Sequence, residues 1–193
     1  MSEITSYITK VHNTDSGTII LYDHANAPGC KIMYEVFDTN QYLENLKKGE
    51  NFPNRNFMID DVVILLGDDG VKVVKTIVNI LYIRTKENLR NQLSATNLMR
   101  EFLKEFESSD DTIVLFRASA TKDDYPEEPT DEQYQEFFNH MMKFLVPFGF
   151  HTIQALCGLE FSIPFLYLSP ISSASKAAWN KFIDWYGDDQ KGE

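Results

Sequence analysis

The chain has 193 residues, 43% of them hydrophobic and 13% aromatic, so it can bury a core and is not an intrinsically disordered segment. Its formal net charge of −11 argues against a nucleic-acid-binding protein, which needs basic surface to meet phosphates. No stretch approaches the ~20 apolar residues of a membrane span, and the N-terminus has no apolar segment of signal-peptide type, so we expect a cytoplasmic protein without a membrane partner.

Two strands and a short helix are predicted near the N-terminus. Residues 17–22 (GTIILY) and 30–38 (CKIMYEVFD) are apolar or alternating, and the stretch between them is rich in turn-forming residues. Residues 38–49 (DTNQYLENLKKG) begin with Asp and Thr and end with Gly, which are signals for the start and end of a helix.

A β-hairpin is the next prediction. The apolar run FMIDDVVILLG (57–67) is typical of a strand, GDDG (67–70) of a turn, and VKVVKTIVNILYIR (71–84) of a second, longer strand.

The second half of the chain alternates helices and strands. An apolar stripe predicts a helix of about four turns that begins within about two residues of Leu93. For a later helix, Thr130 or Asp131 is the expected N-cap. The elements expected after the long strand are a helix to residue 106, a strand at 112–120, an acidic loop at 121–132, a helix at 131–150, two strands within 151–169, and a C-terminal amphipathic helix at 172–186. This order indicates an α/β (α+β) domain that spans residues 1–193.

The segment 71–150 has a recognisable pattern. The loop after the long strand has the sequence RNQLSA (90–95), a helix, a strand and a second helix follow, and the second helix ends at Gly149-Phe150. This pattern resembles the GNAT family of acetyl-CoA-dependent N-acetyltransferases, in which an Arg/Gln-x-x-Gly-x-Gly/Ala loop opens the first of these helices. The resemblance implies a single GNAT-like domain with a mixed central sheet flanked by helices.

The resemblance also implies a cofactor and a reaction. The cofactor would be acetyl-CoA or another acyl-CoA, and the acyl group would pass to a small-molecule amine. Backbone N–H groups at the start of the helix would bind the pyrophosphate, aided by the helix dipole. The residues placed at the cofactor are Ile83, Arg84, Arg90, Asn91, Gln92, Leu93, Ser94, Ala95 and Thr96.

Two positions depart from the family pattern. Leu93 stands where the first loop glycine is expected, and a branched side chain there crowds the phosphates. Leu145 stands where the family often has a tyrosine acid, and it cannot donate a proton to a leaving thiolate. The alternative is therefore a catalytically inactive binding or regulatory module. Its acidic segments, 107–111 and 122–132, would face a basic protein partner.

Several other polar residues each have two possible roles. Arg90 binds phosphate or is a solvated arginine, and Ser94 and Thr96 cap the helix or contact phosphate. The carboxylates considered as a base on the substrate side of the site are Glu35, Asp60 and Asp61. For each of them the alternative is a solvated carboxylate without a catalytic role. Neither the histidines nor the two cysteines, Cys30 and Cys157, have the spacing of a nucleophilic or zinc site. No catalytic residue or metal ligand is assigned.

Overall fold

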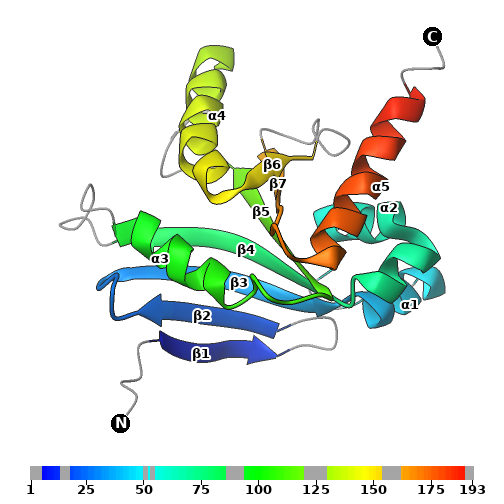
Figure 1. Ribbon diagram of the computed structural model, residues 1–193, viewed down its shortest axis with the longest axis horizontal. Helices are drawn as coiled ribbons and strands as arrows, with labels where there is room; N and C mark the ends of the chain where they lie inside the picture. Colours follow the sequence, from blue (N-terminus) through cyan, green and yellow to red (C-terminus); the bar gives the residue numbers. More distant parts are fainter. Residues whose placement is uncertain are drawn as a thin grey trace.

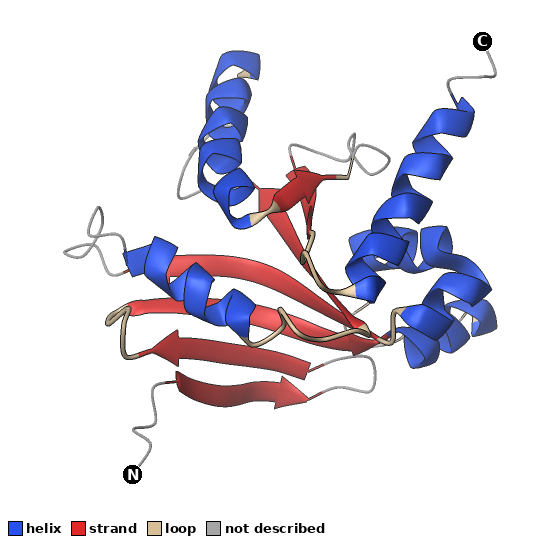
Figure 2. Ribbon diagram, viewed as in Figure 1, coloured by secondary structure: helices blue, strands red, loops and turns tan. Residues whose placement is uncertain are grey.

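The computed structural model describes residues 6–13, 18–49, 52, 55–85, 94–119, 130–153 and 162–189. A seven-stranded sheet in the order β1-β2-β3-β4-β5-β7-β6 forms the centre, with helices on both faces (Figures 1 and 2). The strands are β1 (Ser6–Asn13), β2 (Thr18–His24), β3 (Cys30–Asp38), β4 (Thr76–Thr85), β5 (Thr112–Ser119), β6 (Phe150–Thr152) and β7 (Ser162–Tyr167). The helices are α1 (Thr39–Lys48), α2 (Phe57–Val73), α3 (Ser94–Lys104), α4 (Asp131–Leu145), the short 3-10 helix η2 (Val146–Phe148) and α5 (Ser173–Asp189). The predicted mixed sheet flanked by helices is confirmed.

The sheet is antiparallel except at its centre. Strands β1 to β4 form an antiparallel meander, β4 and β5 run parallel, and β7 pairs antiparallel with both β5 and β6. A parallel pair needs a crossover connection, and α3 lies in the connection from β4 to β5. The order β4, α3, β5, α4, β6 is the succession of strands and helices that the family resemblance implied for residues 71–150.

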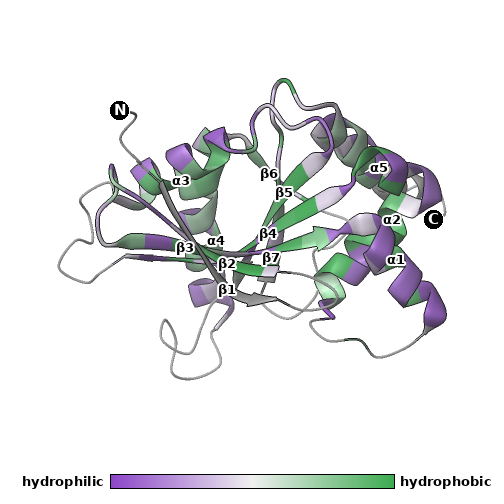
Figure 3. Cartoon of the chain, turned by 90° about the horizontal axis from the view of Figure 1, so that it is seen from below, coloured by the Kyte–Doolittle hydropathy of each residue, from purple (hydrophilic) through white to green (hydrophobic). Residues whose placement is uncertain are grey.

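Two hydrophobic clusters cover the two faces of the sheet. On one face α3 inserts Leu98, Met99 and Phe102 against β2, β3 and β4, and side chains of α4 pack at the margin of the same cluster. On the other face α2 and α5 pack together over β4, β5 and β7. The central strands are accordingly mostly hydrophobic, whereas α3 has hydrophilic as well as hydrophobic positions (Figure 3).

The predicted hairpin over 57–84 is wrong. Residues 57–67 form most of α2, which continues to Val73, and β4 begins only at Thr76. Asn56 caps the helix with its side chain, which accepts a hydrogen bond from the Met58 N–H at 3.1 Å. The buried apolar residues of 57–67 recur at helical spacing: Met58, Ile59, Val62, Val63 and Leu66.

The error has a physical cause. Apolar residues also lie on the exposed side of α2, at Phe57 and Ile64, so the contrast between a polar and an apolar face that marks a surface helix is weak in this run. Packing of α2 against α1 and α5 decides for the helix. At Gly67 the backbone has φ 63° and ψ −177°, a conformation that glycine adopts at no steric cost, and it produces a kink inside α2 in place of the expected turn.

The other predicted elements are present, although the helix predicted over 131–150 ends at Leu145, and β1 is a strand that was not predicted. Asp38 is the N-cap and Gly49 the C-cap of α1, and α3 begins at Ser94, within two residues of Leu93. The strands and helix expected near the C-terminus are β6, β7 and α5. Among the described residues, no helix is long and apolar enough to cross a membrane.

Helix α4 starts with a complete capping box. The Thr130 hydroxyl accepts from the Gln133 N–H at 3.3 Å, and the Gln133 side chain accepts from the Thr130 N–H at 3.0 Å. We expect Thr130→Ala to lower the free energy of unfolding by about 1 kcal/mol, measured by urea denaturation, because it leaves a helix N–H without its acceptor. Thr130→Ser retains the hydroxyl and serves as the control. Equal stability of the alanine and serine variants would contradict this role for the cap.

Candidate functional site

The parallel strands β4 and β5 separate along their length. They pair from Thr76↔Thr112 to Ile80↔Phe116. Beyond that point β4 stays paired with β3 as far as Thr85, and β5 stays paired with β7 as far as Ser119. Figure 1 shows the two strands spreading apart toward their C-terminal ends. In the described part of the chain, the facing edges of both strands therefore have backbone N–H and C=O groups without a strand partner.

An irregularity in β4 lies where the separation begins. Tyr34 of β3 pairs with Ile80, and Met33 pairs with Tyr82, so Leu81 has no partner in the register of β3. Such a bulge bends a strand and changes the direction of its backbone groups. Bulges are over-represented at sheet edges and next to active sites, where they redirect a side chain or end a strand pairing.

The predicted cofactor residues fall into two groups. Ile83 is part of the cluster under α3, and Arg84 is exposed on β4 opposite Lys31 of β3. Ser94, Ala95 and Thr96 form the first turn of α3; Ser94 is buried and the other two are half-buried. Arg90, Asn91, Gln92 and Leu93 lie outside the described residues.

The end of α4 lacks a proton donor at the expected position. Leu145 is fully buried and belongs to the hydrophobic cluster under α3. The neighbouring Phe144 packs with Phe148, with ring centroids 5.6 Å apart. Gly149 ends η2 with φ 92°, and Phe150 then opens β6. This segment stabilises the fold and supplies no acid.

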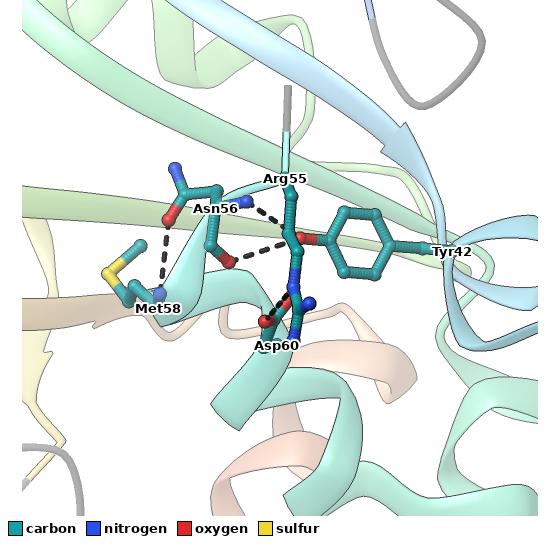
Figure 4. Close-up of polar contacts among 5 residues, drawn as sticks. All are labelled: Tyr42, Arg55, Asn56, Met58 and Asp60. Carbon is teal, nitrogen blue, oxygen red and sulfur yellow. Dashed lines mark hydrogen bonds and ion pairs between the residues drawn. The ribbon is translucent and has the colours of Figure 1, made fainter. Parts of the chain in front are cut away.

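Asp60, one of the carboxylates considered as a base, is committed to other protein groups. Its side chain is buried, the Arg55 Nε donates to its Oδ2 at 2.7 Å, and the Tyr42 hydroxyl donates to its Oδ1 at 2.8 Å (Figure 4). The Tyr42 oxygen in turn accepts from the Asn56 N–H at 2.9 Å. This network fixes α1 to the start of α2. Asp60 is therefore a structural ion-pair partner.

Glu35 lies in a different environment. It is on β3, directly opposite Asn79 of β4, and both side chains are buried. The Asn79 Nδ2 donates to the Glu35 Oε2 at 3.3 Å. Burial raises the pKa of Glu35, and the side chains of Asn79 and Asn56 partly offset this by hydrogen bonding. No ion pair to Glu35 is present among the described residues.

Asn79 was not among the site residues predicted from the sequence. It is the single polar residue in the apolar run IVNIL of β4, and a polar residue in such a run is itself a signal. Its Oδ1 atom is buried and has no hydrogen-bond partner in the described structure. Asn79 pairs with Leu115 of β5, one residue before the last paired position, so it lies beside the separation of the two strands.

The acidic segment 107–111 is partly used within the fold. The Asp110 Oδ1 accepts from the Ser173 N–H at 3.3 Å at the start of α5, and the Asp111 Oδ1 accepts from Ser109 at 3.1 Å. Most of the second acidic segment, 122–132, lies outside the described residues. Cys30 is a buried free thiol, 3.1 Å from the Thr85 hydroxyl, and Cys157 also lies outside them. The described residues contain no cluster of potential metal ligands.

The chain is similar to solved structures of N-acetyltransferases at low sequence identity. Drosophila melanogaster polyamine N-acetyltransferase aligns with a TM-score of 0.44 and 8% identity, over 78% of this chain and 74% of that chain. A mutant agmatine N-acetyltransferase in its apo form aligns with a TM-score of 0.41 and 7% identity, over 77% and 72%. Arabidopsis thaliana NAA60 in complex with acetyl-CoA aligns with a TM-score of 0.37 and 12% identity, over 78% and 76%. No protein-family model and no curated protein matches the chain.

Proposed function

We propose that the protein is a GNAT-like acyltransferase that binds acetyl-CoA or another acyl-CoA between β4 and β5 and transfers the acyl group to an amine. The observation that carries this proposal is the separation of the two parallel strands after Ile80 and Phe116, with a bulge at Leu81. The start of α3 at Ser94, on the connection from β4, supports a phosphate-binding role for that connection.

The strand edges fit the chemistry of the ligand. A pantetheine arm contains two amides in an extended chain, and unpaired strand edges bind extended amide chains by backbone hydrogen bonds. The acyl-CoA supplies a thioester. A β4 N–H near Leu81 is suited to donate to the thioester oxygen as negative charge develops on it. Positioning of the amine and this hydrogen bond supply the rate enhancement, so the proposal requires no tyrosine acid at position 145.

The acceptor in this proposal is a cationic amine. The net charge of −11 attracts cations to the protein and raises their local concentration. Attack requires the neutral amine, so the bound ammonium loses a proton to a nearby acceptor before it reacts.

A second candidate function is an inactive GNAT-like binding or regulatory module. The observation that favours it is the buried Leu145 in place of an acid. The two candidates differ in turnover: an enzyme releases free thiol from acetyl-CoA in the presence of an amine, whereas a module binds its ligand without thiol release.

Calorimetry with acetyl-CoA tests the proposal, and Leu93→Gly is the informative variant. Leu93 directly precedes the first residue of α3, where a glycine allows close approach of the backbone to phosphate. We expect weak binding of acetyl-CoA by the unmodified protein and binding about tenfold tighter by Leu93→Gly. This corresponds to a gain of about 1.4 kcal/mol in binding free energy.

Leu89→Gly is the matched control, because it makes the same substitution outside the loop RNQLSA (90–95) and adds similar backbone freedom. Absence of heat and of a thermal shift at millimolar acetyl-CoA in both the unmodified protein and Leu93→Gly would contradict acyl-CoA binding. Tight binding by the unmodified protein would contradict the role given to Leu93.

A further inference from the structure

Two buried carboxylates on the same side of the sheet differ in how their charge is compensated. Asp60 has a guanidinium and a phenol as partners. Glu35 has only amide partners, and no cation pairs with it among the described residues. A buried carboxylate without a cation is costly, and such groups are concentrated at functional sites.

The amide beside Glu35 is also incompletely satisfied. The Asn79 side chain is 1% exposed, its Nδ2 donates to Glu35, and its Oδ1 has no partner in the described structure. A carboxylate has about four acceptor positions, and the Asn79 amide occupies one of those of Glu35. The Asn79 Oδ1 therefore has no donor in the described structure, and Glu35 has acceptor positions beyond the one that Asn79 occupies. This acceptor pair lies beside the point where β4 leaves β5.

We infer that Glu35 and Asn79 bind the amino group of the acceptor substrate. This inference rests on the proposed function and assigns the amine side of its site. An ammonium group fits because it supplies several N–H donors and also the positive charge that is missing beside the Glu35 carboxylate. A quaternary ammonium carries the charge but has no N–H to donate, so the site should discriminate against it.

The assignment also gives the site a proton acceptor. The ammonium N–H bond breaks toward the Glu35 carboxylate, the electron pair of that bond stays on nitrogen, and Glu35 becomes a neutral acid. Burial raises the pKa of Glu35, which favours the neutral form after transfer. The neutral amine then forms the C–N bond with the acyl carbon as the C–S bond breaks, and the second proton released by nitrogen goes to the thiolate.

The test follows the side-chain amide of Asn79 by NMR in the ¹⁵N-labelled full chain during titration with methylammonium chloride. Its signal is assigned by its loss in Asn79→Leu, which keeps the side-chain volume. We expect methylammonium to shift this signal and tetramethylammonium chloride to leave it unmoved. Glu35→Gln should raise the apparent dissociation constant at least about tenfold.

The matched control is Glu44→Gln, which removes the same charge from an exposed position of α1 and should leave the titration unchanged. Glu35→Gln is isosteric, and its dispersed amide spectrum verifies that it folds. An equal response to the two cations, or equal weakening in both glutamine variants, would overturn the inference and assign the Asn79 shift to surface charge or to water.

Calorimetry with acetyl-CoA on the same proteins separates the two proposals. If acetyl-CoA binds and the methylammonium response does not depend on Glu35, only the amine assignment fails. If the response depends on Glu35 and acetyl-CoA does not bind, the amine site stands and acyl transfer fails.

Discussion

Replacement of Arg55 by methionine should lower the free energy of unfolding by about 2–3 kcal/mol. The Asp60 side chain is 7% exposed, and the Arg55 Nε lies 2.7 Å from its Oδ2. Without the guanidinium, the carboxylate keeps the Tyr42 hydroxyl but loses its cation in a buried position. Because 37% of the Arg55 side chain is exposed, water offsets part of this loss, and the expected value lies below that of a fully buried pair.

The control for Arg55→Met is Lys72→Met. Lys72 pairs with Asp69 at 2.8 Å, but both side chains are exposed, so this variant should be as stable as the unmodified protein. The double variant Arg55→Met/Asp60→Leu should recover much of the lost stability, since it removes the buried charge as well. Urea denaturation measures all of these. Equal effects of the Arg55 and Lys72 variants would contradict a buried role for the Asp60 network.

Replacement of Phe102 by alanine should lower the free energy of unfolding by about 3–5 kcal/mol. Phe102 is fully buried where α3 meets the sheet. Its ring centroid lies 5.3 Å from that of Tyr22, 5.0 Å from Tyr34 and 5.1 Å from Phe106. Alanine leaves a cavity among these rings, and the strands beneath cannot move to fill it without loss of their pairing.

Phe106→Ala is the matched control for Phe102→Ala. Phe106 is the same residue type about one turn further along, it also contacts Tyr34, and it is only half-buried. Thermal and urea denaturation should show a clearly smaller loss for Phe106→Ala than for Phe102→Ala. Comparable losses would indicate that α3 is not held to the sheet mainly through Phe102.

The site could be predicted from the sequence only in part. The strand–helix order around β4, α3 and β5, and the start of α3 at Ser94, follow from local patterns. The sequence also identified Glu35 and Asp60 as notable carboxylates. It could not separate their environments, because Arg55 and Tyr42 reach Asp60, and Asn79 reaches Glu35, only through contacts made in the folded chain.

What the sequence by itself determined were the elements whose signals are local. The caps Asp38 and Thr130 and the alternating residues of β3 specify their own helix starts and strand, because capping and pleat act within a few residues. The local signal at residues 57–67 was weaker, because Asn56 can cap a helix but the apolar run that follows is also compatible with a strand. Only the tertiary structure decided that this run is α2, because its burial against α1 and α5 favours helical spacing. The tertiary structure likewise decided where β4 leaves β5, since strand separation depends on the partners that each strand keeps on its other side.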